Sequence, residues 1–456
     1  MKTKAKAAMA AKTTARVIGA MALSLVTLFI LFGLMGRASA MDIKQVKSPG
    51  GIEAWLVESH QVPLVSIRFA FHGGSTQDPE GKPGVANFVS GMLDEGAGDL
   101  VSATFQERME DIAMRMQFED SRDTFYGDFT TLTKYRDEAV ELLKLALTKP
   151  RFDQEALDRI RRQLLANLAY ESKSPERLAS RTWYETAFKG HAYGLSPTGT
   201  DATIASITRE DLEAFRTKNF AKSNLKVAVV GDIDEATLGK LLDDVFGDLP
   251  EQAQLNELPE IEPKKGNGVE VVEMDVPQSV AVFGMGGLKR KDPDFMAGFV
   301  LNHIIGGGGF SAILMEEVRE KRGLAYSVYS YLSPMDHAAV YLGSVATKND
   351  SIAESLEIIR SELARIAKDG VSEDDLKNAK SYLTGSYALR FDTNSKIASQ
   401  LLGIMVEDMG IDYIKTRNAD VDALTVEDLK RAAKRFLAPE GLLVVVVGKP
   451  TGLKGI

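Results

Sequence analysis

The stretch from Gly306 to Tyr326 reads GGGGFSAILMEEVREKRGLAY, and its parts differ sharply in character. The four glycines allow positive φ angles and close approach of another chain. Apolar residues at steps of three and four then predict a short helix that ends at Gly323. Tyr326 opens an aromatic and β-branched run that is typical of a strand. The alternative interpretation is a flexible turn, a solvated Arg319 and a core tyrosine. No Gly-Lys-Ser/Thr follows the glycines, so they are not a phosphate loop.

The N-terminus has the features of an export signal. Five basic and no acidic side chains lie in residues 1–16, residues 17–36 are almost wholly apolar, and Ala38-Ser39-Ala40 fits a small-x-small cleavage site. We therefore expect residues 1–40 to be a signal peptide, the mature chain to begin near Met41, and the protein to be periplasmic. The alternative is an uncleaved membrane anchor, because about 20 apolar residues can span a bilayer.

Composition limits the classes of function. The chain has 456 residues, of which 44% are hydrophobic and 26% charged, enough for two or more globular domains. It has no cysteine, which excludes disulfides and thiolate metal sites and suits an oxidising periplasm. Loss of residues 1–40 would move the formal net charge from −9 to −15. We therefore expect no binding to nucleic acid or to anionic membrane surfaces.

Hydrophobic periodicity predicts alternating strands and helices before a polar linker. Two- and 3.6-residue periods give strands over residues 52–57, 65–71, 125–132 and 225–230, and helices over 84–93, 101–119, 136–147 and 154–171. A further helix starts after Thr208, with Asp211 as its capping-box partner. Residues 249–268 are rich in Pro, Glu, Gln, Asn and Lys without an apolar period, which predicts a domain linker.

The second half of the sequence repeats the first. Thr208-x-Glu210-Asp211-Leu212 recurs as Thr425-x-Glu427-Asp428-Leu429, an offset of 217. Similar offsets relate three further matches: Val227–Gly231 with Val444–Gly448, Asp78-Pro79 with Asp292-Pro293, and Gly73-Gly74 with Gly286-Gly287. Repetition at one period indicates a duplicated unit. We expect an α+β fold of two homologous domains, residues 42–248 and 269–456, each a mainly antiparallel sheet with packed helices.

These pieces resemble the pitrilysin/insulinase zinc peptidases, the inverzincins, in their short processing-peptidase-like form. The resemblance covers essentially the whole mature chain. It rests on Asp78-Pro79 before Gly84-Val85-Ala86, on Ser174-Pro175-Glu176, on Gly190-His191-x-Tyr193-Gly194, and most specifically on the stretch Phe310–Tyr326. It implies two domains that face each other across a chamber. Active members carry an HxxEH helix whose two histidines, with a distant glutamate, bind zinc, while the glutamate of the motif activates water.

The zinc signature is lost in this chain. By alignment of the apolar residues of the helix 84–93, Asn87 and Gly91 replace the histidines and Ser90 replaces the glutamate. By the family's spacing, Asn167 stands at the third ligand. The resemblance therefore implies that this chain holds no zinc. The residues agree, because no two of its five histidines are four apart; they are His60, His72, His191, His303 and His337.

The resemblance also assigns roles to the opening stretch. In this family an arginine and a tyrosine seven residues apart hold the substrate backbone and the developing oxyanion from the wall opposite the zinc. Here that pair is Arg319 and Tyr326, both hydrogen-bond donors suited to an oxyanion. Arg322 is the competing arginine, but its spacing of four does not fit. Gly306, Gly307, Gly308 and Gly309 correspond, more weakly, to the substrate-contacting glycine-rich stretch of the non-catalytic processing-peptidase subunit.

Three functional hypotheses follow. The first is an exported, non-zinc subunit of a heterodimeric metallopeptidase, in which a sister chain with an intact HxxEH supplies zinc and peptides are the substrates. The second is a catalytically silent peptide-binding or structural subunit, as in respiratory-complex core subunits of this family. The retained arginine–tyrosine pair argues against the second, because a scaffold needs no oxyanion clamp. The third, an independent peptidase with an unorthodox metal site, has the least support in the sequence.

Overall fold

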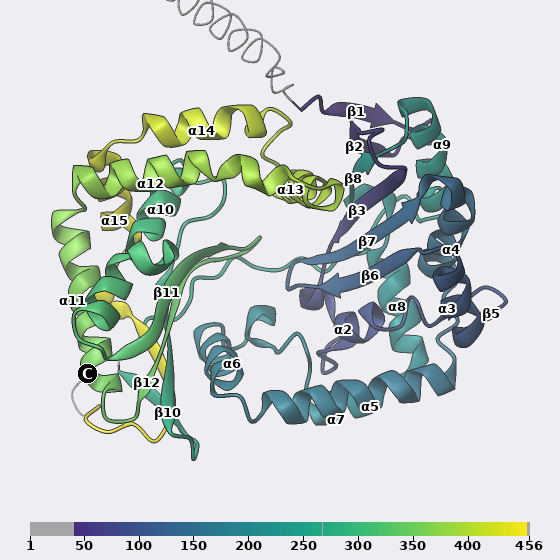
Figure 1. Ribbon diagram of the computed structural model, residues 1–456. Coiled ribbons are helices and arrows are strands. Elements are labelled where there is room, and N and C mark those ends of the chain that lie inside the picture. Colours follow the sequence, from purple (N-terminus) through teal and green to yellow (C-terminus); the bar gives the residue numbers. More distant parts are fainter. Residues whose placement is uncertain (1–40, 267, 454–456) are drawn as a thin grey trace, which may run out of the picture. The chain divides into compact units, whose positions relative to one another are not determined.

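The first half of the chain forms a six-stranded sheet. Figure 1 shows the computed structural model, which describes residues 41–266 and 268–453; the expected signal peptide lies outside them. Neighbouring strands are antiparallel except β2 and β8, which are parallel. The strands, in sheet order, are β1 (Lys44–Lys47), β2 (Glu53–Glu58), β8 (Leu225–Gly231), β3 (Leu64–His72), β7 (Thr124–Leu132) and β6 (Arg115–Asp120).

The helices of this half bury one face of the sheet. Val65, Ile67, Phe69 and Phe71 alternate along β3 and are fully buried in one core with helical residues. A short hairpin joins β4 (Gly96–Ala97) to β5 (Leu100–Val101). The helices are α2 (Val85–Ser90), α3 (Ser102–Asp111), α4 (Arg136–Thr148), α5 (Gln154–Glu171), α6 (Pro175–Ala187), α7 (Asp201–Ser206), α8 (Arg209–Asn219) and α9 (Glu235–Phe246).

The second half forms a five-stranded sheet of the same design. Its only parallel pair is β13 with β9. In sheet order the strands are β11 (Ala325–Pro334), β12 (Ala339–Lys348), β10 (Gln278–Gly286), β13 (Leu443–Gly448) and β9 (Val269–Glu273). The helices are α10 (Phe295–Asn302), α11 (Ile352–Asp369), α12 (Glu373–Gly385), α13 (Asn394–Val406), α14 (Tyr413–Ala423) and α15 (Val426–Phe436). The predicted α+β class, with two mainly antiparallel sheets, is confirmed.

The internal repeat is visible in side-chain packing. Phe69 of β3 is paired across the sheet with Gly127 of β7, and the ring occupies the space that a Cβ of the glycine would need. Phe283 of β10 covers Gly343 of β12 in the same way. The predicted capping box of Thr208 with Asp211 forms, and the repeat has its counterpart in Thr425 with Asp428. The two halves therefore repeat in detail as well as in outline.

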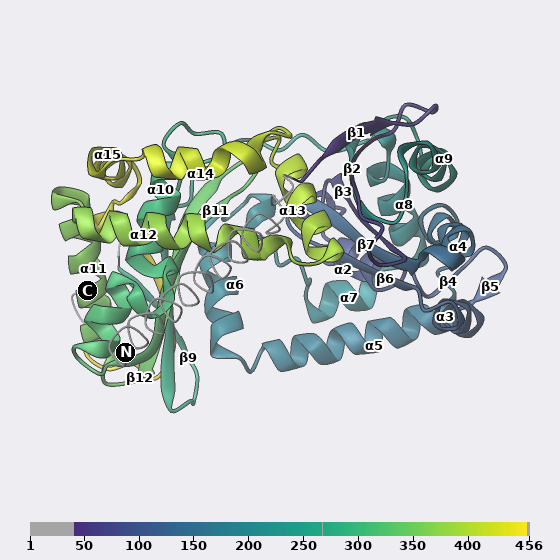
Figure 2. The ribbon, with the colours of Figure 1, turned by 45° about the horizontal axis from the view of Figure 1, so that its top comes forward.

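Each half lends one helix to the other half's sheet. Helix α6 packs on β10 and β13 of the second sheet, where Trp183 is fully buried and its Nε1 donates to Leu443 O at 3.1 Å. Helix α13 packs on β3 and β8 of the first sheet, and Arg68 donates to Ser395 Oγ at 2.7 Å. Figures 1 and 2 show both helices beside the sheet of the opposite half. Packing between the halves thus rests on two exchanged helices.

The segment predicted as a linker is held by backbone hydrogen bonds along its length. Residues 249–266 form neither helix nor strand. Yet the backbone N–H of Gln254 donates to Lys218 O, that of Ile261 to His337 O, and that of Lys264 to Ala187 O, at 2.8–2.9 Å. A composition typical of a flexible linker is therefore compatible with an ordered strap, because backbone groups make the bonds.

One predicted helix is wrong in part. Residues 101–119 have a helical period, but α3 ends at Asp111 and residues 115–120 form β6. There Met116 is buried and Arg115, Gln117 and Glu119 are exposed, which is the alternation of an edge strand. Pairing with β7 overrides the weak helical period. Among the helices of residues 41–266 and 268–453, none has the length and apolar character needed to cross a membrane.

Candidate functional site

Helix α2 holds three of the positions that correspond to the zinc motif. The Asp78 carboxylate accepts the backbone N–H of Gly84 and of Ala86, both at 2.7 Å, and so caps the helix. The Asp78-Pro79 and Gly84-Val85-Ala86 motifs therefore have a structural role, because the first caps the helix that begins in the second. Burial raises the pKa of Asp78 to about 8, against the lowering effect of these hydrogen bonds.

The replaced residues on α2 are committed to other bonds. Asn87 Nδ2 donates to Asp120 Oδ1 at 2.9 Å, and Ser90 Oγ donates to Asn87 O at 2.8 Å. Gly91 caps the helix and offers no side chain. Burial raises the pKa of Asp120 to about 6, while the bond from Asn87 lowers it. An asparagine amide nitrogen that donates to a carboxylate has no lone pair for a metal, so this donor set does not fit zinc.

The third predicted zinc position lies on α5. Asn167 is exposed there. A pocket of about 830 Å³ lies where α2, α5 and β6 meet, and its lining includes Ser90, Gly91, Gln163 and Leu164. Within residues 41–266 and 268–453, no three His, Cys, Asp or Glu side chains are grouped so as to hold a metal ion. In the part of the chain that the structure describes, no other cluster of metal-binding side chains therefore replaces the lost zinc motif.

Tyr326 projects from an irregular point of an edge strand. The register between β11 and β12 shifts between Ala325 and Ser327, and Tyr326 at this bulge is 77% exposed. Its phenol is therefore open to a ligand. Tyr329 and Tyr331 follow on the same strand, half-exposed, with ring centroids 6.4 Å apart and planes 18° apart. The strand presents a row of aromatic rings beside its bulge.

Arg319 sits on a wide helical turn that packs on β11. Met315–Glu320 is π-helical, a form that occurs often at functional sites, and the Met315 sulfur accepts the N–H of Val328 at 3.4 Å. Arg319 Cζ lies 4.8 Å from the Phe310 ring centroid, and its Nε is 3.5 Å from Glu320 Oε1. Phe310 is itself 71% exposed. The guanidinium is held in place by a ring, with most of its donors uncommitted.

The competing arginine is bonded to its own helix. Arg322 Nη1 donates to Glu317 O at 2.6 Å and to Glu317 Oε2 at 2.8 Å. Lys321 also binds Glu317, and both bonds lower the pKa of that carboxyl. Gly323 follows with φ of +65° and ends the turn, as its position predicts. Arg322 therefore has a structural role, which favours Arg319 as the arginine that is available to a ligand.

The four glycines have different environments. Gly306 is buried, and a Cβ there would overlap Ser330 Oγ, so this glycine permits close packing on β11. Gly307 and Gly308 continue the turn, and Gly309 is exposed with φ of +60°. Only Gly309 of the four uses the left-handed region. The sequence predicted that these glycines allow positive φ and close packing, but not that Gly309 would do the first and Gly306 the second.

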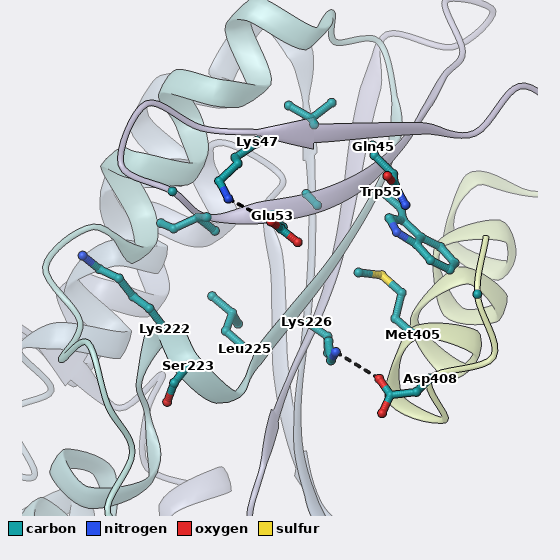
Figure 3. Close-up of a pocket in the computed structure, with 15 residues that line it drawn as sticks. Gln45, Lys47, Glu53, Trp55, Lys222, Ser223, Leu225, Lys226, Met405 and Asp408 are labelled. Atoms are coloured by element: carbon teal, nitrogen blue, oxygen red, sulfur yellow. Dashed lines mark hydrogen bonds and ion pairs between the residues drawn. The ribbon is translucent and has the colours of Figure 1, made fainter. Parts of the chain in front are cut away.

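A pocket of about 680 Å³ lies at the β1–β2 end of the first sheet (Figure 3). Its charged side chains are paired: Lys47 with Glu53 at 3.0 Å, Lys226 with Asp408 at 3.2 Å, and Lys222 with Glu251 at 2.7 Å. Figure 3 shows Met405 of α13 reaching toward Trp55 of β2. The pocket is thus the margin of the contact with α13, and we assign it no chemistry.

The Gly190-His191-x-Tyr193-Gly194 motif contacts both halves of the chain and the segment between them. His191 Nδ1 accepts the Tyr193 N–H, and its Nε2 lies 3.1 Å from Pro259 O in the strap. Tyr193 OH donates to Asp123 Oδ1 at 2.8 Å and accepts the His337 N–H at 2.9 Å. Sequence reasoning missed this role, because the partners outside the motif lie 68 or more residues away.

Comparison with known proteins agrees with these observations. A family model described as "Insulinase (Peptidase family M16)" matches residues 54–201, and "Peptidase M16 inactive domain" matches residues 206–383. A "Non-peptidase homolog YmxG" of Helicobacter pylori is 27% identical over 93% of this chain and 98% of its own length. An "Uncharacterized zinc protease" of Streptomyces coelicolor is 24% identical over 91% of each chain.

Solved structures show the same relationship. A Pseudomonas fluorescens structure described as a "peptidase M16 inactive domain" has a TM-score of 0.84 and 29% identity, covering 90% of this chain and 98% of that one. A Helicobacter pylori protease of 19% identity shares the fold, with a TM-score of 0.80 over 90% of this chain and 100% of its own. The chain therefore belongs to the M16, or insulinase, peptidase family, as an inactive M16-like protein without the zinc motif.

Proposed function

We propose that this chain is the non-zinc subunit of a two-chain metallopeptidase. The observation that carries the proposal is the contrast between its two sites. The zinc positions on α2 are lost to Asn87, Ser90 and Gly91, whereas Tyr326 stands exposed at a strand bulge and Arg319 is held on a ring beside that strand. Exposed donors of this kind have no evident use in the isolated chain.

In this proposal the two residues act on a peptide that a sister chain cleaves. The phenol of Tyr326 donates to the carbonyl oxygen as negative charge develops on it. Arg319 donates to the peptide backbone and adds a positive charge nearby. The sister chain carries the intact HxxEH motif and the zinc, so this chain requires no metal of its own.

Co-purification tests the proposal directly. A tagged form of this chain is expected to retain an HxxEH-bearing M16 chain from its own cells, and the complex is expected to cleave fluorogenic peptides in a chelator-sensitive way. A stable complex without peptidase activity would instead support the silent, structural alternative. Recovery of the chain alone under gentle conditions would refute the two-chain proposal.

The isolated chain is expected to bind no stoichiometric zinc and to cleave no peptide. The reason is the donor set on α2, in which Asn87 is bonded to Asp120 and Gly91 has no side chain. Metal analysis of the purified chain and a peptidase assay with and without chelator check this. About one zinc per chain, with turnover that a chelator abolishes, would contradict it.

We also propose that the mature protein begins near Met41 and resides in the periplasm. Ala38-Ser39-Ala40 after the apolar run 17–36 supports this. Intact-mass measurement of protein from the exported fraction is expected to show loss of residues 1–40. A full-length mass in the membrane pellet would point to an uncleaved anchor instead.

A further inference from the structure

A small pocket beside α6 is lined by three arginines. Its volume is about 290 Å³, and Arg177 and Arg181 of α6 meet Arg122 of the β6–β7 turn there. The only acid in its lining is Glu171. The chain as a whole is acidic, with a formal net charge of −9, so a pocket with three arginines and one acid departs from its overall composition.

Helix α6 places Arg177 and Arg181 close together. Arg177 and Arg181 are four residues apart, so they share one face of α6, and Tyr184 continues that face. Like charges at this spacing destabilise a helix. The opposite face, with Ala179 and Trp183, is buried on the second sheet. The pocket face is therefore turned away from that sheet and toward the β6–β7 turn.

The Arg122 guanidinium stacks on the ring of Tyr184 at the pocket. Its Cζ lies 3.7 Å from the Tyr184 ring centroid, and its Nε donates to Tyr193 O at 3.3 Å. Burial lowers the pKa of Arg122, while the neighbouring Tyr184 and Asp123 raise it. A guanidinium fixed by a ring and a single backbone oxygen keeps its two terminal nitrogens for another acceptor.

The acids near the arginines leave most of their nitrogens without a direct bond. Within the described residues, the one ion pair of the three is that of Arg181 Nε with Glu185 Oε1 at 3.6 Å, which is too long for a hydrogen bond, and this nitrogen is buried. A buried donor without an acceptor costs free energy unless a ligand supplies one. The planar fork of arginine matches a carboxylate with two parallel hydrogen bonds.

The remaining walls suit the end of a peptide. Leu178 and Leu195 line the pocket, and Leu195 is 51% exposed at it, ready to cover an apolar side chain. Ser196 and Thr198 also line the pocket; their hydroxyls bond to each other at 3.1 Å, and each oxygen can still accept a hydrogen bond from a backbone amide. The volume lies at the lower end of the range of ligand pockets, about 300–1,000 Å³, which suits a short segment of a ligand. These walls favour an apolar residue with a free carboxylate over a bare inorganic anion.

We propose that Arg122, Arg177 and Arg181 form a binding site for the C-terminal carboxylate of a peptide whose last residue is apolar. The guanidinium groups bind the carboxylate, and the leucines cover the side chain. The site lies wholly within this chain, so its occupation requires no partner subunit and no zinc.

Fluorescence anisotropy with the purified chain tests the site. The probe is a hexapeptide labelled at its N-terminus and ending in leucine, as the free acid and as the C-terminal amide. The free acid is expected to bind at least tenfold more tightly than the amide. Arg177→Gln and Arg181→Gln are each expected to weaken binding of the free acid roughly ten- to a hundredfold, because each removes a charge-assisted bond.

Matched controls separate this site from general charge. Arg162→Gln on α5 removes the same charge from an exposed position outside the pocket lining and is expected to leave binding unchanged. Thermal melting confirms that each variant is folded. Equal binding of acid and amide, or unchanged binding by both pocket variants, would overturn the proposal. So would full binding of an amidated peptide ending in glutamate, or displacement by inorganic phosphate at peptide-like concentrations.

Discussion

Replacing Tyr326 by phenylalanine is expected to lower kcat of the proposed two-chain peptidase by about 10²–10³, because one oxyanion donor would be lost while the ring remains. In that proposal the phenol donates to charge that is present mainly in the transition state, so KM should change little. Tyr326 is 77% exposed at a bulge, so the change should leave the fold intact. Steady-state kinetics of complexes purified by gel filtration provide the measurement.

Two arginine variants sharpen this test. Arg319→Ala is expected to lower kcat and also raise KM, because it would hold substrate backbone in both states. Arg322→Ala is the matched control. It removes the same charge three residues away, but from a side chain that bonds to Glu317 of its own helix. Wild-type kcat in Tyr326→Phe, or a larger loss in Arg322→Ala than in Arg319→Ala, would remove the catalytic role that we assign to this chain.

Replacing Trp183 by alanine is expected to destabilise the protein by about 3–5 kcal/mol, the usual range for a buried tryptophan. Trp183 is fully buried on the second sheet although it lies in the first half of the sequence. Its removal leaves a cavity between α6 and that sheet and orphans the carbonyl oxygen of Leu443. Urea unfolding followed by circular dichroism measures the loss.

The other tryptophan of the chain is the natural control. Trp55 lies at the margin of the α13 contact and is only partly buried, so Trp55→Ala should cost much less. Trp183→Phe, which keeps a ring but loses the hydrogen bond, should fall between the two. Equal unfolding midpoints for Trp183→Ala and Trp55→Ala would show that the exchanged helix contributes little to stability.

Local signals in the sequence predicted local structure well. Helix α5 begins and ends where its period predicts, the capping box of Thr208 with Asp211 forms, and Gly323 takes the left-handed conformation. Each of these depends on residues close together in the chain. The sequence did not predict strand β6, because six residues give only a short apolar–polar alternation. The helical period of the preceding residues also continues by chance into this strand.

Features made by distant residues left no readable pattern. Periodicity shows that α6 is amphipathic but not which sheet its apolar face meets. The arginine pocket joins Arg122 to a helix more than 50 residues later, and the partners of Tyr193 come from both halves. The zinc positions were identified through the family resemblance, whereas the bond from Asn87 to Asp120 required coordinates.

The exchanged helices also bear on how such a chain arose. Helices α6 and α13 begin 219 residues apart, close to the offset of 217 in the sequence repeat, and each covers the sheet of the opposite half. A chain of half this length would have had an apolar helix face with no sheet of its own to cover. Two copies related by a two-fold axis would satisfy each other by swapping that helix. Fusion of two such copies gives the present arrangement, in which the swap has become intramolecular and no longer depends on concentration.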